Sequence, residues 1–163
     1  MGGFPFPPLF FQPTSPISRL NPTPHLPMIA YTEQTMIEGR QIGIGVDIVS
    51  VKRIEELINR WDGKFLERVF GEQEIRDCQQ KPHPARSLAA RFAAKEAFIK
   101  ALGDAGGLRF REIELRTTEN GSPRLFLSER ILREYGHLVT KVSIAHEKEF
   151  AVAVVLVLSE VRR

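Results

Sequence analysis

Two acidic side chains in this sequence lie among apolar neighbours, where a carboxylate without a partner is costly. Asp47 belongs to the alternating segment QIGIGVDIV (41–49), which predicts a strand with Gly43, Gly45 and Asp47 on one face. A hard cation would satisfy the Asp47 carboxylate, and so would a role as the cap of the next helix or a structural salt bridge. The position alone leaves these alternatives open.

The second acid is Glu96, in the alanine-rich segment RFAAKEAFIKALG (91–103). Lys100 follows it by four residues, which places the two side chains on neighbouring turns of one helix face. Taken alone, this spacing is explained most simply by a surface ion pair worth roughly a few tenths of a kcal/mol. Arg91 and Lys95 form a second basic stripe about a quarter-turn away.

His146 ends the segment KVSIAH (141–146), where alternation places it on the same strand face as Val142 and Ile144. A single histidine in such a place is most often structural. The other three histidines flank proline or glycine, and none has the spacing of a zinc site. The single cysteine, Cys78, excludes an intramolecular disulfide and predicts a reduced, cytoplasmic setting.

The elements that must position these residues follow from periodicity and breakers. A long helix is predicted over 85–102, ending at Gly103, and its alanines keep it slim enough for another element to pack closely. The two strand glycines likewise predict close approach by a ligand or another backbone. Further helices are predicted after Ser50, over 63–79 and over 128–135. Further strands are predicted over 110–117, 124–127, 141–146 and 150–158. This order predicts one α+β domain over 41–160, with a mostly antiparallel sheet packed against the long helix.

Residues 1–40 differ from the rest because proline is frequent there, which blocks helices and sheet ladders. We interpret them as a disordered N-terminal extension. The natural start could also be Met28 or Met36, and IEGR (37–40) matches a protease site used in expression vectors. The segment fits neither a signal peptide nor a transit peptide.

Composition narrows the class of function. Among 163 residues, 42% are hydrophobic, 26% are charged and the formal net charge is +3, which is ordinary for a globular protein. Mild basicity favours an acidic protein partner or a phosphorylated small molecule. Nucleic acid is not expected as a partner, because the sequence has no block of Lys or Arg, zinc spacing or RNP-like aromatic run. The longest apolar run, 150–158, suits a buried strand and is too short to cross a membrane.

Two segments together, GIGVDIVSVKRIE and RFAAKEAFIKALG, resemble the signatures of the holo-acyl-carrier-protein synthases, which are small single-domain 4′-phosphopantetheinyl transferases. NGSPRL and VSIAHEKEFAVAVV match later segments of that family, so the likeness spans about residues 42–158. The resemblance implies a fold of the 4′-phosphopantetheinyl transferase type. It also implies transfer of 4′-phosphopantetheine from coenzyme A to a serine of apo-acyl-carrier protein, with release of adenosine 3′,5′-bisphosphate, in support of fatty acid biosynthesis.

The resemblance also implies roles for individual residues. Mg²⁺, for which Mn²⁺ can substitute, would be held by Asp47 and Glu96. Glu96 would remove the serine proton, directly or through a water, and Lys100 would stabilise or protonate the departing bisphosphate. The positions that match coenzyme A contacts are Arg91, Lys95, Lys100, His146, Asn120, Gly121 and Pro123. Of these, Arg91 and Lys95 match positions that are either phosphate-contacting or structurally paired.

For partners, the resemblance implies docking of an acidic carrier protein on Lys52, Arg53 and Leu57, and a homotrimer with active sites between subunits. GDAGG (103–107) departs from the family's usual Gly-Thr-Gly, and Asp104 brings an unhelpful charge toward a phosphate. Two other classes of function are open: a module that binds coenzyme A or carrier protein without turnover, and, with weaker support, a basic nucleic-acid-binding protein.

Overall fold

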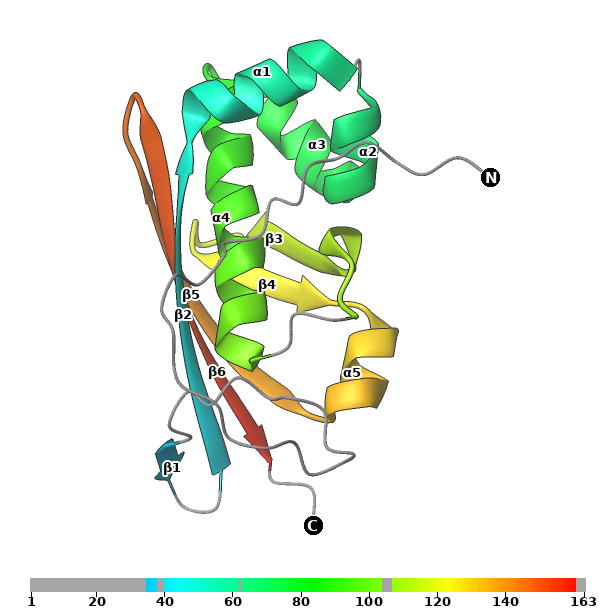
Figure 1. Ribbon diagram of the computed structural model, residues 1–163, viewed down its shortest axis with the longest axis vertical. Coiled ribbons are helices and arrows are strands. Elements are labelled where there is room, and N and C mark those ends of the chain that lie inside the picture. Colours follow the sequence, from blue (N-terminus) through cyan, green and yellow to red (C-terminus); the bar gives the residue numbers. More distant parts are fainter. Residues whose placement is uncertain (1–34, 38–39, 62, 104–106, 161–163) are drawn as a thin grey trace, which may run out of the picture.

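The computed structural model describes residues 35–37, 40–61, 63–103 and 107–160 (Figure 1). The helices are α1 (Val51–Trp61), α2 (Lys64–Val69), α3 (Glu72–Gln79), α4 (Pro84–Leu102) and α5 (Glu129–Tyr135), with a 3₁₀ turn, η1, at Phe110–Glu112. The strands are β1 (Thr35–Ile37), β2 (Arg40–Ser50), β3 (Ile113–Thr117), β4 (Pro123–Leu127), β5 (Leu138–His146) and β6 (Phe150–Glu160). The predicted α+β class is confirmed, with entirely antiparallel pairing.

Four strands form the main sheet in the order β1-β2-β6-β5, and β3 pairs with β4 in a separate two-stranded sheet. In the main sheet, Asp47 of β2 lies opposite Ala153 of β6, which lies opposite Ile144 of β5. Paired residues of antiparallel strands point to the same side, so this row shares one face. Figure 1 shows α4 lying along that sheet, with the helices and the β3–β4 hairpin gathered on one side of it.

The contact between α4 and β2 is unusually close. A Cβ atom added to Gly45 would lie 1.9 Å from the carbonyl oxygen of Ala97, and one added to Gly43 would lie 1.7 Å from that of Ala101. Both distances are far inside van der Waals contact, so neither position has room for a side chain. The close approach predicted from these glycines is confirmed, and the element that approaches is the backbone of the long helix.

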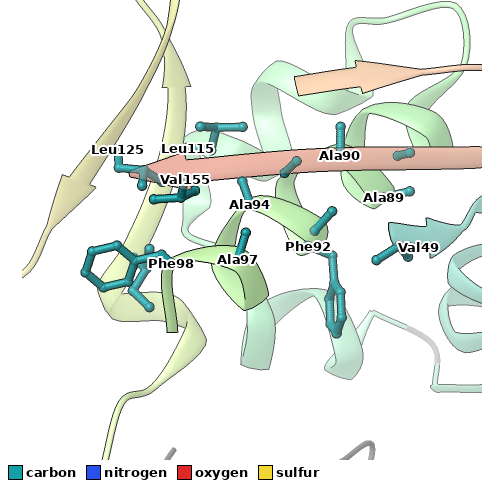
Figure 2. Packing of buried hydrophobic residues seen from close by; sticks show 14 of the residues in the cluster. Val49, Ala89, Ala90, Phe92, Ala94, Ala97, Phe98, Leu115, Leu125 and Val155 are labelled. Atoms are coloured by element: carbon teal, nitrogen blue, oxygen red, sulfur yellow. The ribbon is translucent and has the colours of Figure 1, made fainter. Parts of the chain in front are cut away.

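Small side chains on one side of α4 and large ones on the other divide the core into two parts. Ala94 and Ala97 point toward β6 and its Val155, whereas Phe92 points the other way (Figure 2). The ring of Phe92 stacks on Phe110, with ring centroids 5.2 Å apart. The thin, alanine-lined layer holds α4 against the sheet, and the aromatic layer holds α2 and η1 against α4.

Three predicted helix ends are confirmed in detail. The hydroxyl of Ser50 accepts a hydrogen bond from the backbone N–H of Arg53 at 3.4 Å, and Ser128 caps α5 in the same way. Gly103 ends α4 with a φ of 74°, a conformation that glycine adopts without a steric penalty. Of these three, Gly103 fixes the end of α4, the helix that carries Glu96.

The structure differs from the predicted elements in three places. The predicted helix 63–79 is two helices, because Phe70 is extended and the Gly71 N–H bonds to the side chain of Glu74 at 2.9 Å, starting a new helix. Residues 110–112 form a 3₁₀ turn rather than the start of a strand. Residues 35–37, within the predicted extension, pair as β1 with the edge of β2. Residues 1–34 and Asp104 lie outside the described residues.

The face of the main sheet opposite α4 carries exposed apolar side chains. Ile44, Val46 and Ile48 of β2 have 62%, 53% and 65% of their surface exposed, and Val154 of β6 lies beside Val46 in the same face. An apolar strand face of this extent usually marks a contact with another protein surface. Within the described part of the chain, no helix is both long enough and apolar enough to cross a membrane.

We predict that Gly45→Ala destabilises the fold by about 1–3 kcal/mol, the usual range for overpacking a core, because the added methyl group would strike the α4 backbone. Urea unfolding followed by circular dichroism measures this change. Gly107→Ala is the matched control, since a Cβ there meets nothing within 4 Å. Equal unfolding free energies for the two variants would contradict the proposed constraint.

Candidate active site

Asp47 and Lys100, which are distant in sequence, meet where β2 and α4 touch. The Nζ atom of Lys100 lies 2.7 Å from Oδ1 of Asp47 and donates a second hydrogen bond to the carbonyl of Val46 at 3.1 Å. The Asp47 side chain is 16% exposed, whereas that of Lys100 is 47% exposed. The ion pair of Lys100 therefore spans two elements, and it is not simply the surface pair along α4 that the spacing suggested.

Glu96 adds a second carboxylate to the same place. Burial raises its pKa above the usual range, and the negative charge of Asp47 raises it further. The positive charges of Lys100 and Arg53 act in the opposite direction and do not fully compensate. Asp47 and Glu96 thus lie close enough for the charge of one to act on the other.

This pair of acids suits a hard divalent cation. Mg²⁺ is usually bound by one or two carboxylates together with waters and substrate phosphate oxygens. Asp47 already bonds to the Lys100 ammonium, which is the salt-bridge alternative left open by the sequence, so a divalent cation would have to share or replace that contact. Among the described residues, this site included, acidic, histidine and cysteine side chains form no group of three or more that could hold a metal ion, so Asp47 and Glu96 would need waters and substrate oxygens to complete the coordination.

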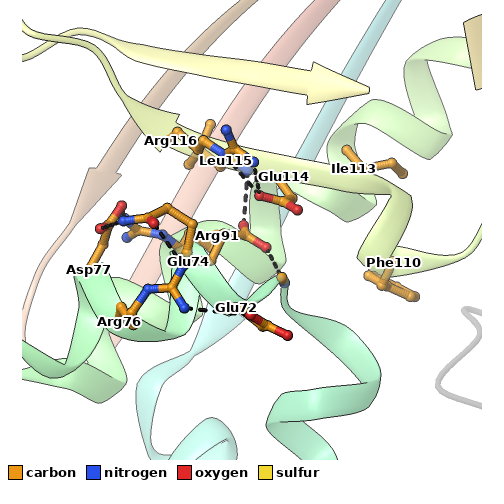
Figure 3. Close-up of polar contacts among 12 residues, drawn as sticks. Glu72, Glu74, Arg76, Asp77, Arg91, Phe110, Ile113, Glu114, Leu115 and Arg116 are labelled. Carbon is orange, nitrogen blue, oxygen red and sulfur yellow. Dashed lines mark hydrogen bonds and ion pairs between the residues drawn. The ribbon is translucent and has the colours of Figure 1, made fainter. Parts of the chain in front are cut away.

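The structure corrects the coenzyme assignment of Lys95. Its side chain is fully buried, 2.6 Å from the Glu74 carboxylate, and cannot contact a bound phosphate. Arg91 is also buried: it donates to the carbonyl of Ser87 at 3.3 Å and lies 4.0 Å from Asp77 (Figure 3). The resemblance allowed two roles for Lys95 and Arg91, contact with a phosphate or a structural pairing. The structural pairing fits both residues.

His146 lies at the exposed end of β5, paired with the buried Ala151. It therefore belongs to the sheet face that α4 covers, as the alternation predicted. Asn120 and Gly121 lie in the turn of the β3–β4 hairpin, where Gly121 has a φ of 82° and Asn120 Oδ1 accepts from the Ser122 N–H at 3.2 Å. Pro123 begins β4. The proposed coenzyme contacts of these residues stay predictions.

The three predicted docking residues of α1 point in different directions. Lys52 is exposed and lies 4.0 Å from Glu56. Arg53 is close enough to Glu96 to act on its pKa, so its charge belongs partly to the acidic cluster. Leu57 is half-buried and packs against the core. Lys52 is the docking candidate with the fewest constraints inside the fold.

A hollow of about 650 Å³, which the sequence analysis did not identify, lies where the first residues of α1 and α4 meet the turn between β5 and β6. Three cationic side chains line it, from Lys52, Arg86 and Lys148, together with His83 and the acids Glu55 and Glu149. Its residues come from three separate segments, so sequence spacing gave no signal. Its size and charge suit a small anionic group.

Comparison with known proteins gives a consistent family. A family model described as the 4′-phosphopantetheinyl transferase superfamily matches residues 43–155. A holo-[acyl-carrier-protein] synthase from Halothermothrix orenii is 41% identical over 118 residues, which are 70% of this chain and 94% of that protein. One from Gloeobacter violaceus is 42% identical over 120 residues, covering 71% and 91% of the two chains.

Solved structures show the same relationship in three dimensions. The holo-[acyl-carrier-protein] synthase of Helicobacter pylori, in complex with coenzyme A, aligns with a TM-score of 0.64 at 39% identity, covering 70% of this chain and 98% of that one. The Bacillus anthracis enzyme, in complex with CoA (3′,5′-ADP), aligns with a TM-score of 0.61 at 36% identity, covering 72% and 96%.

Proposed function

This chain belongs to the 4′-phosphopantetheinyl transferase superfamily, and we propose that it transfers 4′-phosphopantetheine from coenzyme A to a serine of apo-acyl-carrier protein. The products would be holo-acyl-carrier protein and adenosine 3′,5′-bisphosphate. The observation that carries this proposal is the meeting of Asp47, Glu96 and Lys100 at one point of contact between β2 and α4. The names of the relatives and the coenzyme A in two similar structures agree with it.

Asp47 and Glu96 are the residues that would hold Mg²⁺, or Mn²⁺ in its place. The bound ion would neutralise charge on the pyrophosphate of coenzyme A, a charge that otherwise repels an attacking hydroxyl. The repulsion between the two carboxylates, evident in the raised pKa of Glu96, supports this assignment, because a cation between them would relieve it. Lys100 would then be free to leave Asp47 and turn toward the substrate.

The chain's own residues would handle the proton and the departing group. In the reaction the serine oxygen bonds to the β-phosphorus, and the bond from that phosphorus to the bridging oxygen breaks. Glu96 is our candidate to accept the serine proton, because its raised pKa makes its carboxylate a stronger base than an ordinary glutamate. Lys100 would donate to the phosphate oxygen that leaves with adenosine 3′,5′-bisphosphate, a role supported by its half-exposed side chain.

The acidic carrier protein and the coenzyme would approach over basic surface. Lys52 on α1 would attract the carrier, and Arg53 and Leu57 beside it would take part to a lesser extent. The cationic hollow, which Lys52 also lines, would extend this basic surface toward the carrier, and His146, a proposed coenzyme contact, lies at the neighbouring strand end. Fatty acid biosynthesis in the cytoplasm is the setting we propose, supported by the family resemblance and by a buried, unpaired cysteine.

We also propose that the chain forms a homotrimer through the exposed apolar face of the main sheet. Ile44, Val46 and Ile48 would lose most of their exposure in such a contact, and each buried aliphatic side chain contributes about 1.5–3 kcal/mol. The family resemblance supplies the number of subunits. The sheet face supports only the existence of a contact between copies.

For turnover, we expect the mass of an apo-carrier protein to rise by one 4′-phosphopantetheine group on incubation with the chain, coenzyme A and Mg²⁺, and EDTA to prevent it. Glu96→Gln should lower the rate by about 10²–10⁴-fold, since a base and a cation ligand are lost together. Intact-protein mass spectrometry measures both. Glu67→Gln on the exposed side of α2 is the control. Coenzyme binding without any mass gain would indicate a binding module, and salt-sensitive DNA binding instead would indicate a nucleic-acid-binding protein.

For carrier docking, Lys52→Glu should raise the KM for carrier protein several-fold and leave the KM for coenzyme A nearly unchanged, because rim charges act mainly on encounter. Steady-state kinetics with each substrate varied in turn separates the two. Lys64→Glu, an exposed lysine at the start of α2, is the charge-matched control. A carrier KM equal to that of the unmodified chain would remove Lys52 from the docking surface.

For assembly, Ile44→Asp should lower the mass of the particle in solution, because a buried carboxylate without a partner opposes the contact. Sedimentation velocity gives the mass of each species. Leu132→Asp changes a similarly exposed apolar residue on α5, away from the main sheet face, and should leave the trimer intact. A monomeric unmodified chain, or an unchanged mass for Ile44→Asp, would refute this interface.

A further inference from the structure

A buried ion pair outside the acidic cluster joins α3 to α4. Glu74 and Lys95 are both fully buried, with Oε2 of the acid 2.6 Å from Nζ of the lysine. Figure 3 shows Glu74 between α3 and strand β3. Neither residue belongs to the proposed chemistry, because neither has any surface to offer a substrate.

Each polar side-chain atom of this pair is hydrogen-bonded. The Glu74 carboxylate also accepts the backbone N–H groups of Gly71 and Leu115, each at 2.9 Å. The Lys95 ammonium donates to the carbonyl of Phe110 at 2.9 Å and to that of Ile113. The pair therefore fixes α4 to the start of α3, to η1 and to β3 at once.

Stability alone is a weak reason for such an arrangement. Buried ion pairs often contribute no more to stability than apolar side chains of the same volume, and their best-attested use is to select one geometry. Here α4 needs such a selection. At Gly43 and Gly45 its contact with β2 joins backbone to backbone, which sets the separation of the two elements. Only the half-exposed Lys100, bonded to Asp47 and Val46, adds a polar side-chain contact there, so a second, buried contact would help to set the rotation of the helix.

Lys95 and Glu96 are adjacent on α4. One rigid helix therefore carries both a member of the buried ion pair and a member of the acidic cluster. Successive helical residues are about 100° apart. Lys95 bonds to Glu74, whereas Glu96 lies near enough to Asp47 for that charge to raise its pKa. A carboxyl group about 5–6 Å from the helix axis moves by about 1 Å when the helix turns by about 10°. Errors of about 1 Å in a reactive site can lower rates about 100-fold.

We propose that Glu74 is a positioning residue: through Lys95 it sets the rotation of α4 and hence the distance between Glu96 and Asp47 at which the two acids hold a divalent cation. The inference rests on the proposed function, because it assigns those acids to a cation. Glu74 itself touches neither the cation nor the substrate.

The test replaces the pair and measures Mn²⁺ binding to the chain without substrates. Glu74→Gln alone leaves the Lys95 charge buried without its counter-ion and could fail to fold, so the main variant is Glu74→Leu with Lys95→Met, which keeps the volume and removes both charges. The signal of free Mn²⁺ in electron paramagnetic resonance gives the dissociation constant. We expect the double variant to fold and to bind Mn²⁺ at least about 10-fold more weakly, as when outer-shell partners of metal ligands are lost.

Ile131→Ala is the control, since it opens a cavity in the fully buried core of α5 away from the pair. It should lower the melting temperature and leave Mn²⁺ affinity unchanged. The positioning role alone would be overturned if the folded double variant bound Mn²⁺ as tightly as the unmodified chain. It would also be overturned if Ile131→Ala lost as much Mn²⁺ affinity as the double variant. An unmodified chain that binds no Mn²⁺ would overturn the proposed cation site as well, so the two failures are distinguishable.

Discussion

The fold depends on the absence of side chains between β2 and α4. Gly43 and Gly45 meet the backbone at Ala97 and Ala101, so the strand and helix lie closer than ordinary helix–sheet packing allows. This closeness brings the Asp47 carboxylate within 2.7 Å of the Lys100 ammonium, although 53 positions separate them in the chain. Because interiors are close-packed, a single methyl group at either glycine would have to be absorbed by moving the whole helix.

Two charged groupings on α4 differ in how completely they are neutralised. The Glu74–Lys95 pair is buried and satisfied, with three accepted and three donated hydrogen bonds. The Asp47–Glu96–Lys100 cluster is partly exposed, and burial together with Asp47 raises the pKa of Glu96. A carboxyl group with a shifted pKa in an accessible place is typical of a functional site, whereas a fully hydrogen-bonded ion pair in the interior is typical of a structural one. Because both groupings include residues of α4, a shift of this helix would move the structural pair and the acidic cluster together.

The main sheet is covered on one face only. Helices and the small hairpin lie on the α4 side, while the other face presents aliphatic residues of β2 and β6 to solvent (Figure 1). The apolar run 150–158 predicts a strand that is buried on both faces. It does not predict which surface covers each face. The single described domain supplies one layer of cover. The proposed contact with a second copy of the chain would cover the other face.

The sequence by itself determined the order of most elements, the helix boundaries at Ser50 and Gly103, and the faces of β2, because these depend on local periodicity and on the backbone preferences of a few residues. It also determined the family, through two motifs whose residues stand next to one another in the chain. It did not separate α2 from α3, because the signal at Gly71 depends on the side chain of Glu74 closing back on it. Only the tertiary structure decided that Lys95 points inward to Glu74 while its neighbour Glu96 points to Asp47, and that Lys52, Arg86 and Lys148 line one hollow. Those outcomes depend on which distant segment each side chain meets, and helical spacing carries no information about that partner.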